Sequence, residues 1–200
     1  MLRFRMATAD DAGAMLAIYG PAVRDTAASF EFDPPTADDM AARVEKTIDR
    51  WPWIVAEQRD DTTGELVRIA GYAYAGLSRA RAAYQWTCEV SVYVHPDARR
   101  LGVGRELYLR LFALLRVQGF CNALAGITLP NDASVALHGG VGFKLVGVYH
   151  RVGFKFGTWH DVAWYEVRLA DVAAPERTPL TVAEAASRPE WQAALAADVV

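Results

Sequence analysis

The sequence contains only two cysteines in 200 residues, Cys88 and Cys121, and they lie far apart. This scarcity argues against a disulfide framework and against a zinc site built from cysteines. No run approaches 18 uninterrupted apolar residues, and the opening MLRFRMATADD lacks the apolar stretch of a signal peptide. We therefore expect a reduced, cytoplasmic protein with no membrane partner.

The chain also lacks an excess of either charge. It carries 21 basic and 24 acidic residues, a formal net charge of −3, so no chain-wide basic surface for nucleic acid is expected. The 52% hydrophobic and 22% charged content is typical of a globular protein rather than a disordered one. A chain of this length is expected to form one domain with an ample core.

Several catalytic and ligand-binding motifs are missing. There is no GxxxxGK phosphate loop and no GxSxG nucleophile elbow, and HGGVG at 138–142 therefore has no nucleophile to serve. The histidines at 95, 138, 150 and 160 lack the HExxH spacing, so we expect no metal site. These absences disfavour a P-loop enzyme, a serine esterase and a metalloenzyme.

Hydrophobic periodicity predicts a mixed α/β fold. The expected strands cover residues 2–6, 53–58, 68–75, 86–94, 122–129, 143–154 and 160–169. The expected helices follow Thr8, run from Thr36 to Arg50 and from Val103 to Gln118, and follow Asn131. Composition changes at DVAAPERTPL, which divides the chain into a compact domain at 1–170 and an appendage at 171–200. We expect the appendage to form short docked helices.

The most informative segment is a strand that leads through a basic turn into a helix. Gly102 and Gly104 in RRLGVGR allow backbone N–H groups to converge at the helix start, where phosphate oxygens bind. Arg99, Arg100 and Arg105 add positive charge. Taken alone, the same pattern also describes an ordinary strand-to-helix turn with solvated arginines.

The order of these motifs resembles the GNAT acetyltransferase superfamily. The resemblance rests on RxxGxG at Arg99–Gly104, followed by a strand and then by NxxS at Asn131–Ser134 on a second helix. PWIVAE, RARAAYQWTCEVSVYV, LPNDASVALH and GFKFGTWHDV are similar to the phosphinothricin N-acetyltransferase group. Over residues 2–169 the resemblance implies a single α/β domain of GNAT fold, with a mixed, mostly antiparallel twisted sheet flanked by helices.

The resemblance implies acetyl-CoA as co-substrate. Its pyrophosphate would bind the 100–105 turn, and its pantetheine arm would lie along the strand at 92–94, whose free edge offers main-chain N–H and C=O groups. The implied cofactor-binding residues are Val92, Tyr93, Val94, Arg99, Arg100, Leu101, Gly102, Val103, Gly104, Arg105, Asn131 and Ser134. Helix capping is an alternative, compatible role for Asn131.

Two residues are candidates for proton transfer. Glu89 lies on the strand face opposite Val90, where burial would raise its pKa, and the family assigns a glutamate in this motif as general base. The alternative is a structural pairing of Glu89 with a loop arginine. His138 stands where the superfamily often has tyrosine, near the leaving thiolate, but a lone histidine is more often structural. Gly139 and Gly140 are poor helix formers, so we expect the helix to fray early.

A basic, aromatic loop before the Glu89 strand suggests recognition of a small anionic substrate, because guanidinium groups bind carboxylates in bidentate fashion. The candidate substrate-binding residues, some of them implied by the family only, are Phe30, Arg79, Arg81, Tyr84, Gln85, Trp86, Thr87 and Lys155. Solvated loop charges are the alternative for the two arginines.

Together these features predict an acetyl-CoA-dependent N-acetyltransferase. Its expected acceptor is the α-amine of a small amino acid or analogue, such as phosphinothricin or methionine sulfoximine, attacked directly in a ternary complex. Exposed aromatic residues at 153–161 further suggest a homodimer. The alternatives are a protein or peptide N-acetyltransferase and a non-catalytic acyl-CoA sensor domain.

Overall fold

The computed structural model describes residues 1–171, 175 and 177–196. Seven strands form one sheet in the order β1-β2-β3-β4-β5-β7-β6. The strands are β1 (Leu2–Met6), β2 (Trp53–Arg59), β3 (Leu66–Leu77), β4 (Thr87–Val94), β5 (Asn122–Leu129), β6 (Lys144–Lys155) and β7 (Thr158–Arg168). Every neighbouring pair is antiparallel except β4 and β5, which are parallel. The expected mixed, mostly antiparallel sheet is confirmed.

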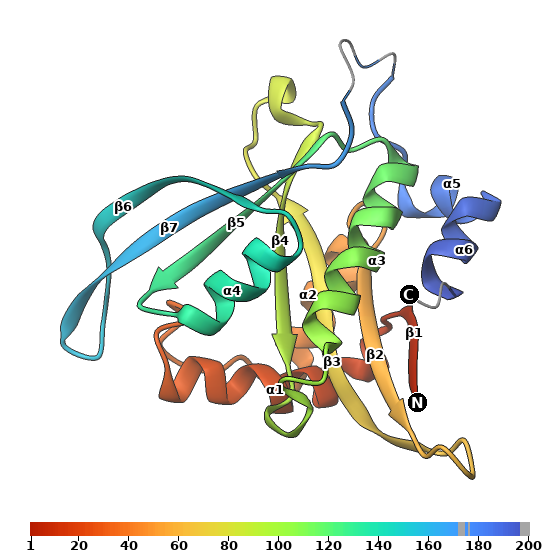
Figure 1. Cartoon of the computed structure of the whole chain (residues 1–200), viewed down its shortest axis with the longest axis horizontal. Helices are drawn as coiled ribbons and strands as arrows, with labels where there is room; N and C mark the ends of the chain where they lie inside the picture. The colour runs from red at the N-terminus through yellow and green to blue at the C-terminus, as the bar shows by residue number, and fades with distance from the viewer. Residues whose placement is uncertain (172–174, 176, 197–200) are drawn as a thin grey trace.

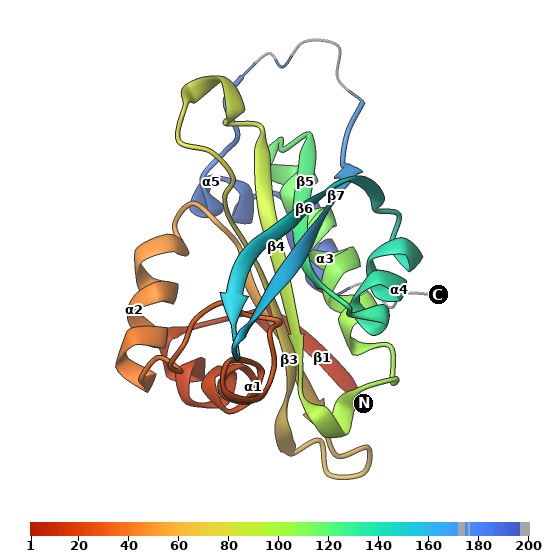
Figure 2. The same cartoon turned by 90° about the vertical axis from the view of Figure 1, so that its left-hand side faces the viewer.

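Helices cover both faces of the sheet. α1 (Ala12–Asp25) and α2 (Ala37–Thr47) lie on one face, and α3 (Val103–Gln118) and α4 (Asp132–Gly140) lie on the other (Figures 1 and 2). Side-chain alternation along the strands explains this arrangement. Tyr72 belongs to the core cluster of α1 and α2, whereas Val90 belongs to the larger cluster around α3.

The helix ends follow the capping signals of the sequence. Thr36 accepts a hydrogen bond from the Asp39 N–H at the start of α2, and Gly119 ends α3 with a left-handed φ of 99°. The expected early end of α4 is wrong, because α4 continues through Gly140. Tertiary contacts outweigh the low helix propensity here: His138 is buried, and its carbonyl accepts a hydrogen bond from the Phe143 N–H.

The C-terminal segment completes the main core. Helices α5 (Val182–Ala186) and α6 (Pro189–Ala196) pack against α3 (Figure 1). Trp191 is only 1% exposed, and the Gln118 side chain donates a hydrogen bond of 2.8 Å to the Leu180 carbonyl. The expected short docked helices are confirmed, and they share one hydrophobic cluster with the sheet. Within the described ranges, no helix is long and apolar enough to cross a membrane.

The sheet opens between its two parallel strands. β4 and β5 pair only between Thr87–Glu89 and Asn122–Leu124, and Figure 1 shows β5 diverging from β4 beyond that point. β5 stays paired with β7 along its whole length, so β7 and β6 diverge with it. The divergence exposes main-chain groups of β4 to the space between the strands.

Candidate active site

A cavity of about 1240 Å³ occupies the opening between β4 and β5. Its walls come from both faces of the sheet, with Ile18 and Ala22 of α1 on one side and His138 of α4 on the other. The segment Val90–Val94 of β4 runs along it. The cavity therefore passes through the plane of the sheet.

The basic turn forms one end of this cavity. Gly102 has a left-handed φ of 79°, which favours glycine, and α3 begins at the next residue, so its first N–H groups face the turn. A Cβ on Gly104 would lie 3.0 Å from Leu137 Cδ2, so glycine permits close packing of α3 on α4. All the residues predicted to bind acetyl-CoA line the cavity except Leu101, which is 62% exposed and outside the lining.

Asn131 combines the two roles considered for it. Its side chain accepts a hydrogen bond of 3.1 Å from the Ser134 N–H and so caps α4. Both residues also line the cavity. The capping hydrogen bond therefore holds both Asn131 and Ser134 at the cavity wall.

Glu89 lies beside the cavity rather than in its lining, which includes its neighbours Val90 and Ser91. In the antiparallel register Glu89 pairs with Gly76 and Ser91 pairs with Tyr74, so Glu89 shares the face of α1 and α2. Burial raises the pKa of Glu89 above its ordinary value of 4.5, although a hydrogen bond with Ser78 and the charge of Arg79 oppose this. A carboxylate with a raised pKa is suited to accept a proton near neutral pH.

His138 is 4% exposed and hydrogen-bonded at both ring nitrogens. Nδ1 lies 2.7 Å from the Ser134 carbonyl oxygen, which only accepts, so Nδ1 carries the proton. Nε2 then accepts the hydrogen bond of 2.8 Å from the Tyr108 hydroxyl. Burial lowers the pKa of His138 below 6.5, and burial raises the pKa of Tyr108 far above its usual range. The pair is therefore a neutral imidazole and a protonated phenol, and both line the cavity.

Lys155, a predicted substrate-binding residue, has its ammonium group inside the protein. Its side chain is 2% exposed, and its Nζ donates hydrogen bonds to the carbonyls of Val23, Thr26 and Ser29 at 2.6, 3.0 and 2.7 Å. All three ammonium protons are thereby used within the protein. The side chain therefore turns inward to main-chain acceptors, and a role for Lys155 toward substrate stays a prediction.

Phe30 lies against the β6–β7 hairpin near Lys155. Its ring occupies the space over Gly153, where a Cβ would come within 2.2 Å of the ring, and its centroid is 6.1 Å from that of His160. His160 lines the cavity. Glycine at 153 is therefore required for Phe30 to lie over the hairpin.

The other predicted substrate-binding residues belong to a loop at the start of β4. Arg79, Arg81 and Tyr84 are exposed, and the Arg79 guanidinium lies 5.5 Å from the Tyr84 ring centroid. The Trp86 indole N–H donates to the Arg177 carbonyl at 2.9 Å. Gln85 in this loop and Thr87, the first residue of β4, are partly buried. The loop, at the top of Figure 1, and the tip of the β6–β7 hairpin, at its lower left, lie well apart, so within one chain the predicted substrate residues form two separate groups.

The Glu89 face also carries an aromatic surface that sequence reasoning missed. A hollow of about 290 Å³ is lined by Tyr19, Trp53, Tyr74 and Arg43, among others. Trp53 and Tyr74 stack with centroids 4.0 Å apart. Arg43 donates two hydrogen bonds to Glu31, at 2.8 and 3.1 Å, which fixes its orientation. The available sequence signal was Tyr72 and Tyr74, two residues apart on one predicted strand, with Trp53 at the start of another.

Tyr108 and His160 are among the cavity-lining residues that the sequence analysis did not predict. The sequence pattern of α3 predicts Tyr108 to be a core residue. In the structure its hydroxyl is hydrogen-bonded to His138 in the cavity wall. His160 stood within a quoted motif without an assigned role. Neither position has a local sequence signal for function, because each depends on contacts between distant elements.

Comparison with known proteins identifies the family. The model for the acetyltransferase (GNAT) domain matches residues 4–164. A phosphinothricin N-acetyltransferase of Streptomyces viridochromogenes is 38% identical over 176 residues, covering 88% of this chain and 92% of that protein. An L-methionine sulfoximine/L-methionine sulfone acetyltransferase of Salmonella typhimurium is 34% identical, covering 88% and 99%.

A solved structure agrees with these relatives. The crystal structure of a GNAT superfamily phosphinothricin acetyltransferase from Sinorhizobium meliloti, in complex with AcCoA, superimposes with a TM-score of 0.77 at 34% identity. The match covers 89% of this chain and 92% of that one. The fold, the cavity between the diverging strands and the relatives lead to one conclusion: this chain belongs to the GNAT acetyltransferase family.

Proposed function

We propose that this protein transfers the acetyl group of acetyl-CoA to the α-amine of a small amino acid or amino acid analogue. The observation that carries the proposal is the cavity through the sheet, with the basic turn and the free β4 edge on one side and the Glu89 face on the other. The names of the relatives, which act on phosphinothricin or on methionine sulfoximine and sulfone, support this acceptor class.

The proposed reaction is a direct attack in a ternary complex. Glu89 takes a proton from the ammonium of the acceptor, directly or through water, and the freed lone pair attacks the thioester carbonyl carbon. As the carbon–sulfur bond breaks, the nitrogen loses its second proton and the thiolate gains one, so the products are the acetylated amine and free coenzyme A. The Tyr108 hydroxyl, held by His138, is the protonated group on the opposite cavity wall.

A covalent relay through cysteine does not fit this site. Cys88 is fully buried on the strand face opposite Glu89, and burial raises the pKa of its thiol. A thiol acts as a nucleophile only as thiolate, so this environment makes it inert. Direct transfer is the simpler route.

Turnover of an amine panel tests the proposal. Free thiol released from acetyl-CoA is measured with phosphinothricin, methionine sulfoximine, common amino acids and a short peptide, for the wild type and for Glu89→Gln. We expect amino acid analogues to be the best acceptors and Glu89→Gln to lower kcat at neutral pH by about a hundredfold or more, with partial recovery at high pH. Release with the peptide alone would favour a peptide acetyltransferase, and no release with any amine would favour an acyl-CoA sensor.

We also propose a homodimer, because the β6–β7 hairpin exposes many large apolar side chains. These are Leu145, Val146, Tyr149, Val152, Phe154, Phe156 and Trp159. Such a patch on one hairpin is typical of a surface that another protein covers. Light scattering that reports only a 22.0 kDa particle at micromolar concentration would contradict this proposal.

A further inference from the structure

Lys155 is a buried cation that connects parts of the chain 126 to 132 residues apart. Its three acceptors are main-chain carbonyls, and its side chain is 2% exposed. A buried charge is costly unless it is hydrogen-bonded, and here every ammonium proton has an acceptor. The arrangement is therefore a built contact rather than a surface lysine that happens to fold inward.

The acceptors lie at the end of α1 and in the segment that follows it. α1 ends at Asp25, so the Val23 carbonyl is among those that no later helix residue can satisfy. The negative end of the helix dipole also favours a cation at this place. Lys155 thus closes the end of α1 and holds the bend between Thr26 and Ser29.

This bend forms part of the cavity wall. Thr26, Ala27 and Ala28 line the cavity on the face that carries Glu89. The β6–β7 hairpin contributes His160 to the same wall. Lys155 also positions this residue, because the His160 Nε2–H donates a hydrogen bond of 3.1 Å to the Lys155 carbonyl. Phe30, which follows the bend, packs over Gly153. One residue therefore joins the bend and the hairpin into a single wall.

We propose that Lys155 is a positioning residue that fixes the acceptor side of the cavity without touching the acceptor. The inference rests on the proposed function and assigns Lys155 a role in acceptor binding, not in binding of acetyl-CoA. The basic turn that would hold the pyrophosphate lies at residues 99–105, on elements that Lys155 does not contact through its ammonium. Loss of the ammonium should therefore weaken acceptor binding selectively.

The test compares three variants of the full chain. Lys155→Met keeps the length of the side chain but removes all three donors, and Lys155→Arg restores donors and charge. Lys144→Met is the matched control, because Lys144 is an exposed lysine on the same strand. Steady-state turnover gives kcat and the acceptor KM, and calorimetry gives the Kd of acetyl-CoA.

We expect Lys155→Met to raise the acceptor KM about tenfold, with kcat and the acetyl-CoA Kd each changing less than about threefold. Lys155→Arg should recover a large part of the KM, and Lys144→Met should match the wild type. Hydrogen exchange at residues 23–30 should be faster in Lys155→Met than in Lys144→Met. An unchanged acceptor KM, or an equal loss in KM, kcat and acetyl-CoA binding, would overturn the proposal.

A second variant covers the case in which Lys155→Met fails to fold. Gly153→Ala leaves the ammonium in place but forces the Phe30 ring off the hairpin, so it should raise the acceptor KM without altering acetyl-CoA binding. An unchanged KM in this variant would also overturn the proposal. If the wild type acetylates no amine, the proposed function fails and the acceptor role fails with it. Faster exchange with an unchanged KM refutes the acceptor role alone.

Discussion

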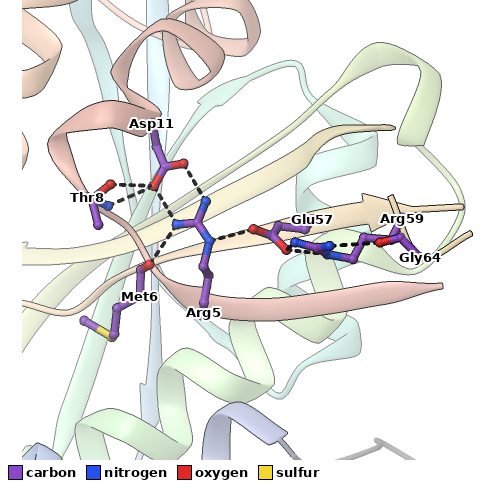
Figure 3. Close-up of polar contacts among 7 residues, drawn as sticks. All are labelled: Arg5, Met6, Thr8, Asp11, Glu57, Arg59 and Gly64. Carbon is purple, nitrogen blue, oxygen red and sulfur yellow. Dashed lines mark hydrogen bonds and ion pairs between the residues drawn. The ribbon is translucent and has the colours of Figure 1, made fainter. Parts of the chain in front are cut away.

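Arg5 holds a cluster of charges where β1 and β2 meet the start of α1. Its Nε donates to Glu57 at 2.7 Å, and its two terminal nitrogens donate to the two oxygens of Asp11, each at 2.7 Å (Figure 3). Arg59 donates to the other oxygen of Glu57. Asp11 is 7% exposed and Glu57 is 4% exposed, so both carboxylates depend on these partners.

The substitution Arg5→Met keeps most of the apolar stem and removes the three charged hydrogen bonds. Removing one partner of a buried ion pair costs about 3–5 kcal/mol, because the other charge stays buried. The Arg5 side chain is 32% exposed, so water screens part of the interaction. We expect a loss of about 2–3 kcal/mol in the free energy of unfolding, or about 5–10 °C in Tm for a chain of this size.

The loss should depend on pH in a defined direction. Burial alone would raise the pKa of both carboxyls, but the hydrogen bonds from Arg5 and its neighbours hold Asp11 below 3.8 and Glu57 below 4.5. A carboxyl whose pKa is lowered by folding stabilises the fold above its unfolded pKa, and this stabilisation is lost as pH falls through its folded pKa. The difference between wild type and Arg5→Met should be full above about pH 5 and smaller in acid.

Urea unfolding at about pH 7 and about pH 3.5 measures both effects. Arg3→Met serves as control, because Arg3 is exposed on the same strand and its loss should change stability little. A loss below about 1 kcal/mol for Arg5→Met at neutral pH would contradict the argument from buried carboxylates. An equal loss at both pH values would show that the missing interaction is packing and not charge.

Three further outcomes follow from the structure. His138 should remain neutral with its proton on Nδ1 at pH 7, because burial lowers its pKa below 6.5, and nitrogen NMR of the imidazole reads this directly. Trp191→Ala should lower the free energy of unfolding by about 3–5 kcal/mol in denaturant titration, since the indole is 1% exposed in the main core. Gly102→Ala meets no neighbouring atom but strains a φ of 79°, so calorimetry should show acetyl-CoA binding weakened about fivefold or more.

Local sequence patterns were sufficient for the elements that depend on neighbouring residues. The strand at 122–129 and the helix at 103–118 have the expected bounds, because alternation and a terminal glycine act within a few residues. The face of Glu89 also follows from alternation alone. Fold-level features such as the divergence of β4 from β5 have no comparable signal, since they depend on pairing between segments far apart.

The contacts that side chains make were harder to predict than the place of their residues in the fold. The motif around Lys155 suggested a residue at the site, which is where the hairpin lies, but the ammonium binds carbonyls of a segment that carries no lysine-specific pattern. Arg79 and Arg81 were predicted at the site because their loop is close to Glu89 in sequence. The structure places this loop outside the cavity lining. Sequence proximity indicates the neighbourhood of a site, whereas burial and hydrogen bonding decide which atoms face a ligand.

The two charged contacts described above act on the same helix. Asp11, which precedes α1, is held by Arg5, and the carbonyls at the other end of α1 are held by Lys155. Between them, Ile18 and Ala22 form part of the cavity wall. Because each contact leaves a nearly buried charge or carbonyl unpaired when broken, displacement of α1 at either end is costly. In the proposed reaction the acceptor binds against this wall, so we expect selection among amines to depend on how well they fit a surface that is formed before binding.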